Sequence, residues 1–455
     1  MEVAVIGLGK LGAPMAAIFA ASGHQVIGVD RLESTVDMVN RLEPPVFEPD
    51  LAETLAKTEG RLRATSNLAE AVRNARITFV IVPTPSDKRD AFSMDFAEIA
   101  AMQIGEALHG RTDPHLVVMT STVMPGDTEK IFIAALELAA GRKLGDNLGV
   151  CYSPEFIALG SCIRDFLHPD LLLIGESNPQ WGELLESFYR TVHLSRPAVY
   201  KMSIVNAEIA KISLNSFVTM KISFANMIAS ICEKFPGGNV DAVTGALGAD
   251  TRIGAKYFKG SVSFGGPCFP RDNKALARLG KDLGLDLHLP TATDQVNESP
   301  LERTLALIEA MGGKNKTIGI LGLAYKPGTN VVEKAFGMAL AEALNRRRRA
   351  VVAHDFHALD LASRILPDEI ALTDSVEKCV RRCDIIVLAL PCAGYKAIDT
   401  AWLKGPSPRK MIIDCWRFAD RASLENLADV VALGTGECLE FTAAQPQGIP
   451  LGVAV

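Results

Sequence analysis

The feature that most constrains this fold is a glycine-rich turn at the start of the chain. The apolar run "MEVAVI" predicts a short buried strand, and "GLGKLG" leads directly into "APMAAIFAASG", which has helical apolar spacing. Gly7, Gly9 and Gly12 therefore form G-x-G-x-x-G between a strand and a helix. Gly7 permits a tight turn, Gly9 lets the backbone approach a pyrophosphate, and Gly12 lets the helix pack closely on the strand. This arrangement predicts a dinucleotide site, with the helix N-terminus facing the phosphates.

The residues that end the second strand, "HQVIGVD", indicate which dinucleotide binds. An Asp at position 30 can bond both ribose hydroxyls and repels a 2′-phosphate, which favours NAD. The neighbouring Arg31 is a reservation, because an arginine there serves NADP in some sites. We expect Gly7, Gly9, Leu11, Gly12 and Asp30 to bind NAD.

The rest of the chain predicts an α/β protein. Apolar strands alternate with helix-like stretches at both ends, which is typical of doubly wound parallel sheets. Between them, the segment from "MSIVNAEIAK" to "ASICEKF" has helical spacing without Gly or Pro and predicts one long helix or two joined end to end. We predict two Rossmann-like domains. The first covers residues 1–197 and binds NAD, the second covers residues 312–440, and a central helical domain over 198–311 joins them. Residues 441–455 show no clear pattern and are expected to form a loosely ordered tail.

Composition excludes several classes of protein. The formal net charge of −6 gives no electrostatic footprint for nucleic acid or an anionic membrane. No apolar run is long enough to span a bilayer, and the N-terminus lacks the features of a signal peptide. Nine scattered cysteines do not form a disulfide framework, so a cytoplasmic protein is expected. Cys379 and Cys383 are interpreted as helix packing, and no metal site is predicted.

Two stretches carry candidate chemistry. In "SFGGPCFPRDN", Cys268 lies on a predicted turn, closely followed by Arg271 and Asp272. These residues alone are compatible with an incidental cysteine or with a thiolate tuned by nearby charges. In "NAEIAKISLNS", Lys211 and Asn215 are four residues apart and share one helix face. That pair indicates either a functional pair or a solvated stripe.

Seven motifs together resemble the UDP-glucose/GDP-mannose dehydrogenase family. They occur in the family's order and span about Val3 to Thr329, with weaker similarity to about Asp414. The motifs are "GLGKLG", "VPTPSD", "TSTVMPGDT", "SPEF", "AEIAKISLNSFVTMKISFAN", "FGGPCFPRD" and "GILGLAYKPGT".

The resemblance implies a two-step oxidation of the C6 hydroxyl of a nucleotide sugar, with reduction of two NAD. Cys268 is then the nucleophile, and its adduct with the C6 aldehyde is a thiohemiacetal that loses hydride to give a thioester. Lys211 stabilises the oxyanion and Asn215 holds the same oxygen or the sugar. Asp272 helps to activate the hydrolytic water.

The same resemblance assigns further residues. Thr122 positions water, Glu155 is a candidate general base beside Phe156 in "SPEF", and Thr84 lines the nicotinamide pocket together with Thr122. The loop of Phe264 and Gly265 surrounds the sugar nucleotide, and Lys326 contacts the substrate from the C-terminal domain. Members of the family generally dimerise through the central helix, and some assemble further, so a homodimer or a larger assembly is expected.

The chain departs from the family at several positions. Ala158 and Leu159 replace a polar or charged residue and a Glu, and Leu171 stands where Arg is common. In "TNVVEKAF" the family's Arg falls at Glu333, and its Ser-Pro falls at Ala335 and Phe336. The late "D-G-R-N"-like segment reads "DCWRF". Because a charge reversal near a diphosphate or a nascent carboxylate is not conservative, we hypothesise an altered sugar or nucleotide preference, or a different subunit contact.

UDP-glucose is the leading substrate, because "KISFAN" and "CFPRD" are closest to the UDP-glucose members. Members that act on 2-acetamido sugars more often carry His where this chain has Pro267. GDP-mannose or a UDP-N-acetylhexosamine is the alternative. A catalytically weak nucleotide-sugar-binding protein and a β-hydroxyacid dehydrogenase are alternatives of other classes, but the second leaves Cys268 and the third domain unexplained.

Overall fold

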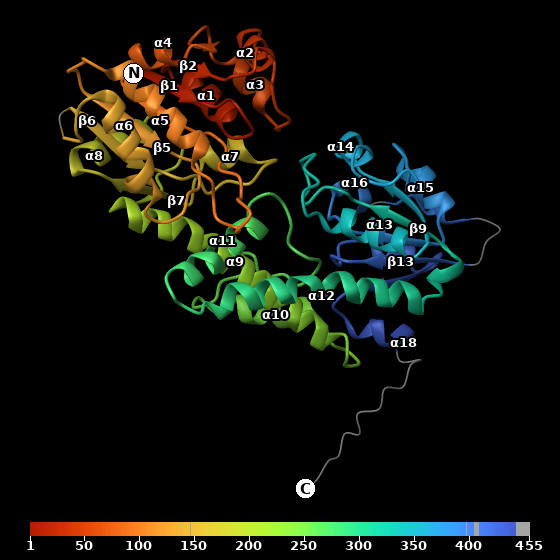
Figure 1. Ribbon diagram of the computed structural model, residues 1–455. Coiled ribbons are helices and arrows are strands. Elements are labelled where there is room, and N and C mark those ends of the chain that lie inside the picture. The colour runs from red at the N-terminus through yellow and green to blue at the C-terminus, as the bar shows by residue number, and fades with distance from the viewer. Residues whose placement is uncertain (146, 397, 405–408, 443–455) are drawn as a thin grey trace. The chain divides into compact units, whose positions relative to one another are not determined.

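The computed structural model describes residues 1–145, 147–396, 398–404 and 409–442 (Figure 1). The chain divides into two compact units. Unit 1 comprises Met1–Leu214 and Lys274–Asp286, and unit 2 comprises Asn215–Asn273 and the chain from Leu287 onward. The division falls within two helices, α9 (Ile204–Cys232) and α11 (Phe269–Asp282).

Unit 1 is built on an eight-stranded sheet with the order β3-β2-β1-β4-β5-β6-β7-β8. Every neighbouring pair is parallel except β6 and β7, which are antiparallel. The strands are β1 (Glu2–Ile6), β2 (Gln25–Val29), β3 (Leu62–Thr65), β4 (Ile77–Val80), β5 (His115–Met119), β6 (Leu148–Tyr152), β7 (Leu171–Glu176) and β8 (Ala198–Met202).

The helices of unit 1 connect these strands. They are α1 (Gly12–Ala21), α2 (Glu33–Asn40), α3 (Leu51–Ala56), α4 (Leu68–Arg73), α5 (Asp95–Leu108), the π-helix η1 (Thr128–Ile133), α6 (Ala134–Ala140), α7 (Cys162–Leu167) and α8 (Pro179–Arg190). Helix α8 shows why such a segment is helical. The Asn178 side chain caps its N-terminus by accepting from the N–H of Gln180, and Pro179 occupies the first turn.

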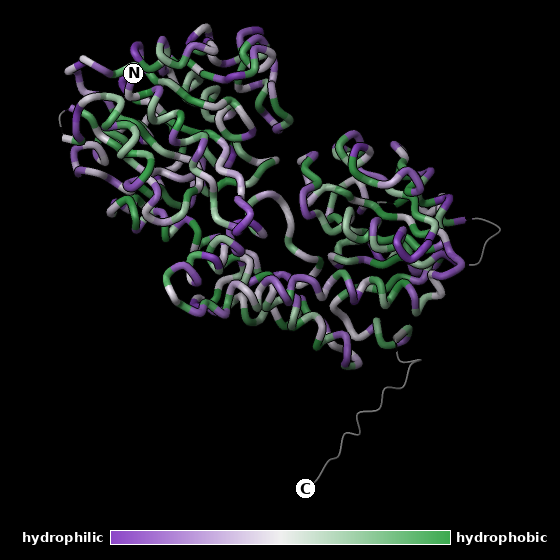
Figure 2. Tube along the Cα trace, viewed as in Figure 1, coloured by the Kyte–Doolittle hydropathy of each residue, from purple (hydrophilic) through white to green (hydrophobic). Residues whose placement is uncertain are grey.

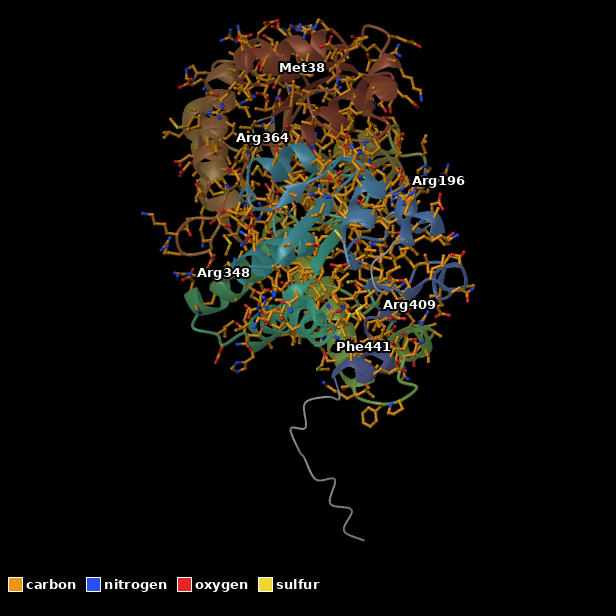
Figure 3. All side chains as sticks on the ribbon, turned by 90° about the vertical axis from the view of Figure 1, so that its right-hand side faces the viewer. Met38, Arg196, Arg348, Arg364, Arg409 and Phe441 are labelled. Carbon is orange, nitrogen blue, oxygen red and sulfur yellow. The ribbon has the colours of Figure 1, made fainter. Side chains whose placement is uncertain are left out.

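Unit 2 contains a six-stranded, fully parallel sheet with the order β11-β10-β9-β12-β13-β14. Its strands are β9 (Thr317–Leu321), β10 (Ala350–His354), β11 (Ala371–Leu372), β12 (Ile385–Leu388), β13 (Lys410–Asp414) and β14 (Ala428–Ala432). Its helices are α10 (Val240–Gly248), α12 (His288–Ala310), η2 (Gly313–Asn315), α13 (Phe336–Arg346), α14 (Leu359–Ser363), α15 (Val376–Arg382), α16 (Ala393–Lys396), η3 (Thr400–Leu403), α17 (Arg421–Leu424), η4 (Gly436–Cys438) and α18 (Leu439–Thr442). Arg347 and Arg349 in the basic run after α13 form ion pairs with Glu302 and Glu309 of α12, and Arg348 between them is labelled in Figure 3.

The predicted fold class is confirmed: the chain has one mostly parallel and one fully parallel sheet of Rossmann type, and a long central helix, α9. The strands of both sheets are largely apolar in Figure 2, as expected for sheets covered on both faces. One detail differs, because the helical segment expected from position 198 begins at Ile204. Residues Ala198–Met202 instead form β8, an edge strand whose side chains are mostly exposed, so it lacks the apolar run that marks the other strands.

The two sheets share one turn geometry. In unit 1 the Gly7 N–H donates to Val29 O, and a Cβ at Gly12 would lie 1.8 Å from Gly7 O. In unit 2 the Gly322 N–H donates to His354 O, and a Cβ at Gly337 would lie 1.9 Å from Gly322 O. In each unit, glycines therefore bring the helix that follows β1 or β9 into direct contact with the turn.

Candidate active site

Of the three glycines in the unit 1 turn, only Gly9 has open space beside it for a ligand. Gly7 has φ +95°, and a Cβ there would lie 2.4 Å from Ile81 O. A Cβ at Gly12 would collide with Gly7 O, whereas a Cβ at Gly9 meets nothing within 4 Å. The space beside Gly9, at the N-terminus of α1, fits the close approach of a pyrophosphate.

Asp30 is tied to the same turn. Its Oδ2 accepts from the Leu8 N–H at 2.9 Å, and its Oδ1 accepts from the Leu32 N–H at 3.0 Å. Each carboxylate oxygen can accept a further hydrogen bond, so the pair suits the two hydroxyls of a ribose. The Arg31 guanidinium lies over the Phe96 ring, 5.2 Å from its centroid.

Thr120, Ser121 and Thr122 follow β5 directly, at the carboxyl ends of the parallel strands. The Thr84 hydroxyl donates to Thr122 O at 2.7 Å, and the Ser121 hydroxyl donates to Val82 O at 2.6 Å, so the loops after β4 and β5 are joined. The buried Thr120 Oγ1 has no hydrogen-bond partner among the described residues. An unpaired buried hydroxyl at this edge fits a site that a bound cofactor completes.

Glu155 lies after β6 in a network that the sequence did not predict. Its Oε1 accepts from the Tyr189 hydroxyl at 3.3 Å, and its backbone oxygen accepts from Lys211 Nζ at 2.6 Å. Lys211 Nζ also lies 4.6 Å from the centroid of the Phe156 ring. Burial raises the pKa of the Glu155 carboxyl to about 7, against the lowering effects of the Tyr189 hydrogen bond and the Lys211 charge.

Glu208 is a second residue that sequence reasoning missed. It is fully buried on α9, and its carboxylate accepts from the N–H groups of Gly126 and Thr128 at 2.6 and 3.0 Å. Burial raises its pKa, and burial together with the Glu208 charge raises the pKa of Asp127 to about 6. Glu208 thus holds the "TSTVMPGDT" loop against α9, the helix that carries Lys211. The sequence signal that could have identified Glu208 is its spacing of three residues from Lys211, which places both on one helix face.

In unit 2, Cys268 is exposed and immediately precedes α11. The Asp272 N–H donates to Cys268 O at 2.8 Å, which closes the first turn of the helix. Because helix N-termini favour negative charge, this position favours a thiolate.

Asp272 is fully buried beneath that turn, and two side chains hold its carboxylate. Asn215 Nδ2 donates to Oδ2 at 2.6 Å, and Arg271 Nε and Nη2 donate to Oδ1 at 3.0 and 2.9 Å. The pairing of Asn215 with Asp272 joins α9 to the cysteine turn. A buried carboxylate held by both oxygens has a fixed direction, as a group that orients water requires.

The loop before the cysteine packs against the loop after β9. The Gly266 N–H donates to Glu333 O at 2.9 Å, and a Cβ at Gly265 would lie 2.1 Å from Lys334 O. A Cβ at Gly266 would lie 2.7 Å from the Tyr325 ring. Glu333 therefore makes this contact through its backbone oxygen. Because its side chain is exposed, having Glu where the family has Arg changes the surface and leaves the pairing of the two loops intact.

The structure brings the predicted residues together in four groups, two in each unit. Unit 1 holds the glycine turn with Asp30 and Leu11, and the group of Thr84, Thr122, Glu155, Phe156 and Lys211 at the carboxyl ends of its strands. Unit 2 holds Asn215, Cys268 and Asp272, and the paired loops that carry Phe264, Gly265 and Lys326.

Family comparisons agree with this order of segments. The NAD binding domain of the UDP-glucose/GDP-mannose dehydrogenase family matches residues 1–193, its central domain matches 205–299, and its UDP binding domain matches 319–421. UDP-glucose 6-dehydrogenase AglM of Haloferax volcanii is 34% identical over 403 residues, covering 88% of this chain and 93% of that protein. GDP-mannose 6-dehydrogenase of Pseudomonas putida is 30% identical over 426 residues, covering 90% and 95%.

A solved structure shows the same architecture. The UDP-glucose dehydrogenase of Pyrobaculum islandicum superposes with a TM-score of 0.86 at 31% sequence identity, covering 95% of this chain and 97% of that one. NAD is the cofactor of this chain, in keeping with the glycine turn and the match to an NAD binding domain. From the fold, the cofactor turn and the three matched domains, the chain belongs to the UDP-glucose/GDP-mannose dehydrogenase family of NAD-dependent nucleotide-sugar 6-dehydrogenases.

Proposed function

We propose that this chain oxidises the C6 hydroxyl of a nucleotide sugar to a carboxylate, with UDP-glucose to UDP-glucuronate as the leading reaction. The observation that carries the proposal is the Cys268 turn. An exposed thiol stands at a helix N-terminus, one turn from a buried carboxylate that Asn215 and Arg271 hold in place.

NAD held at the turn of Gly7, Gly9 and Gly12 would supply a hydride acceptor for each of the two oxidation steps. After the first step, the Cys268 thiolate attacks the C6 aldehyde and forms a C–S bond, which gives a thiohemiacetal oxyanion. The Lys211 ammonium stabilises this oxyanion. Loss of hydride from C6 leaves a thioester, and attack of water breaks the C–S bond, releases the carboxylate and restores the thiolate.

Two carboxylates are assigned to the hydrolytic water. Asp272 orients it beside the thioester, and Glu155 serves as general base. A pKa of about 7 for Glu155 suits that role, because a base is most effective when its pKa lies near the working pH. Thr122 positions the water, and Thr84 lines the nicotinamide pocket.

The substrate is assigned to the paired loops of unit 2, with Phe264 and Gly265 around the sugar nucleotide and Lys326 on the loop after β9. Relatives named as UDP-glucose 6-dehydrogenases support UDP-glucose. A GDP-mannose 6-dehydrogenase at 30% identity keeps GDP-mannose as the alternative, with UDP-N-acetylhexosamines beside it. We retain the hypothesis that Glu333 alters the sugar or nucleotide preference or a subunit contact.

The function is tested by measuring NADH formation with a panel of UDP- and GDP-sugars and counting NADH per sugar consumed. Two NADH per sugar from UDP-glucose, with poor activity on NADP, is the expected result. A good rate at ordinary efficiency with UDP-glucose alone would overturn the altered-preference hypothesis for Glu333. Measurable binding of NAD and nucleotide sugar without NADH from any substrate would favour a binding protein.

We also propose that the chain forms a homodimer through the central helix. Within unit 2, α9 and the residues after it carry an exposed apolar stripe at helical spacing, made of Phe217, Phe224, Met227, Ile231 and Phe235. Val243 and Leu247 on α10 are also exposed. Self-association would remove such a surface from water.

Replacing both Phe217 and Ile231 with Glu is expected to shift the chain from dimer to monomer in light scattering, because two charges would be buried in an apolar interface. Leu138→Glu on α6 is the control, since Leu138 is 82% exposed and lies outside this stripe. A dimer that persists in the double variant would contradict the proposed interface.

We propose an NAD-binding domain over 1–197, a central helical domain over 198–311, a nucleotide-sugar-binding domain over 312–440 and a tail over 441–455. All nine cysteines lie among the described residues and none of them forms a disulfide, which supports a reducing compartment such as the cytoplasm. We propose that the product feeds polysaccharides, other glycoconjugates or specialised metabolites. No helix in the described part of the chain combines the length and apolar character that a membrane span needs.

A further inference from the structure

Tyr189 lies where it can control Glu155. It is the next-to-last residue of α8 and is fully buried. Its ring stacks on His193, with centroids 5.1 Å apart, and packs edge-on against Phe79 and Phe188 at 6.1 and 5.9 Å. A ring held on several sides has one orientation, so its hydroxyl is presented at a fixed point.

That point lies between two residues of the segment after β6. The Tyr189 hydroxyl donates to Glu155 Oε1 at 3.3 Å, and the Ser153 hydroxyl lies 3.4 Å from the same phenol oxygen. The Ser153 hydroxyl also lies 3.1 Å from Leu173 O on β7. Ser153, Tyr189 and Glu155 therefore form a short chain of polar groups that ends on the carboxylate.

We propose that Tyr189 is a positioning residue for Glu155: its hydroxyl fixes the direction of the carboxylate and stabilises its charged form, so that Glu155 can accept a proton from the hydrolytic water. This inference rests on the proposed function, in which Glu155 is the general base.

Among the other ionisable groups around this pair, Lys211 also favours the charged form of Glu155, through its positive charge. Lys211 faces Glu155 from α9, but its ammonium donates to the backbone oxygen of Glu155. Burial lowers the pKa of His193, which stacks on Tyr189, to about 4, so it is neutral in the working range. Burial holds the pKa of the Cys151 thiol on β6 well above its usual range, so that thiol is also neutral. The Tyr189 hydrogen bond is the leading influence that lowers the pKa of Glu155 against burial.

The test is the pH dependence of kcat in Tyr189→Phe. A general base must be ionised, so its pKa sets the acid limb of the profile, and loss of the hydrogen bond is expected to move that limb upward by about 0.5 to 1 pH unit. The rate then falls near pH 6 to 7 and recovers at alkaline pH. The KM values for NAD and the nucleotide sugar are expected to stay within about twofold, because Tyr189 acts through Glu155.

Tyr395→Phe is the matched control. It removes another fully buried phenol hydroxyl, one that contacts His354 in unit 2, and is expected to leave the acid limb in place. Equal loss of kcat at every pH in Tyr189→Phe, with an unshifted limb, would overturn the proposal and leave Tyr189 a packing residue.

A direct titration separates this inference from the proposed function. The infrared carboxyl band that disappears in Glu155→Gln reports the protonation of Glu155 without turnover, and its midpoint is expected to rise in Tyr189→Phe. If no nucleotide sugar yields NADH, the proposed function fails. The infrared band still decides the role of Tyr189 in that case, because a raised midpoint in Tyr189→Phe supports stabilisation of the carboxylate and an unchanged midpoint contradicts it. If the wild-type enzyme is active and the band does not move, the inference about Tyr189 fails alone.

Discussion

Cys268→Ala is expected to stop the reaction after its first oxidation. The alcohol can still lose hydride to give an aldehyde, but without the thiolate no thiohemiacetal forms, and an aldehyde does not readily lose a second hydride. Formation of the uronic acid is expected to fall by on the order of 10³-fold or more, the scale seen when a covalent nucleophile is removed. The measurement counts NADH per sugar and detects the products by mass spectrometry, with at most one NADH per sugar expected.

Cys392→Ala provides the control for this experiment. Cys392 is the other cysteine that is not buried, and it lies in the loop after β12, a strand of the unit 2 sheet. Its loss is expected to leave the ratio of two NADH per sugar unchanged. A Cys268→Ala enzyme that still produces two NADH per sugar at the wild-type rate would rule out covalent catalysis through this residue.

A pair of glycine substitutions is expected to separate folding from cofactor binding. In Gly12→Ala the new Cβ would lie 1.8 Å from a backbone oxygen, which cannot move like the end of a flexible side chain. The free energy of unfolding is expected to fall by about 3 kcal/mol or more. In Gly9→Ala the new Cβ meets no protein atom within 4 Å, so the free energy of unfolding is expected to change by less than about 1 kcal/mol.

The expected effect of Gly9→Ala appears in NAD affinity. Its methyl group would occupy the space assigned to the pyrophosphate, so the Kd for NAD is expected to rise about tenfold or more, which corresponds to about 1.4 kcal/mol. Calorimetric titration measures the affinity, and thermal unfolding without NAD serves as the control for both variants. Unchanged NAD binding in a well-folded Gly9→Ala protein would mean that the cofactor does not approach this glycine.

The sequence carries most of the fold because the two sheets are buried. β12 is a continuous apolar run and β4 is interrupted only by the buried Thr78, so local hydropathy is enough to find them. The strands that escaped notice lie at sheet edges or are short. β8 consists of exposed and half-buried residues, and β11 has two residues. Edge strands are specified by their pairing with a neighbour rather than by an apolar run of their own.

For the candidate site, the sequence is enough to predict the residues that lie in a local motif, but not the partners that contact them. Cys268 and Asp272 lie in one continuous stretch, and Lys211 and Asn215 share a helix. Tyr189 lies 34 residues from Glu155, and Glu208 is about 80 residues from the backbone it holds. Contacts of this kind depend on how the strands are ordered in the sheet, which residue spacing along the chain does not encode.

The shared turn geometry of the two sheets has a consequence for stoichiometry. The position two residues after the turn glycine is the open Gly9 in unit 1 and the buried Ala324 in unit 2. Asp30 accepts two backbone N–H groups, whereas Asp355 accepts four, from Leu323, Ala324, His357 and Ala358. The second turn thus fills with its own backbone the bonds that a ribose would need. Of these two turns in the described part of the chain, the first therefore keeps the open glycine and the spare acceptor positions that NAD requires, and the second does not.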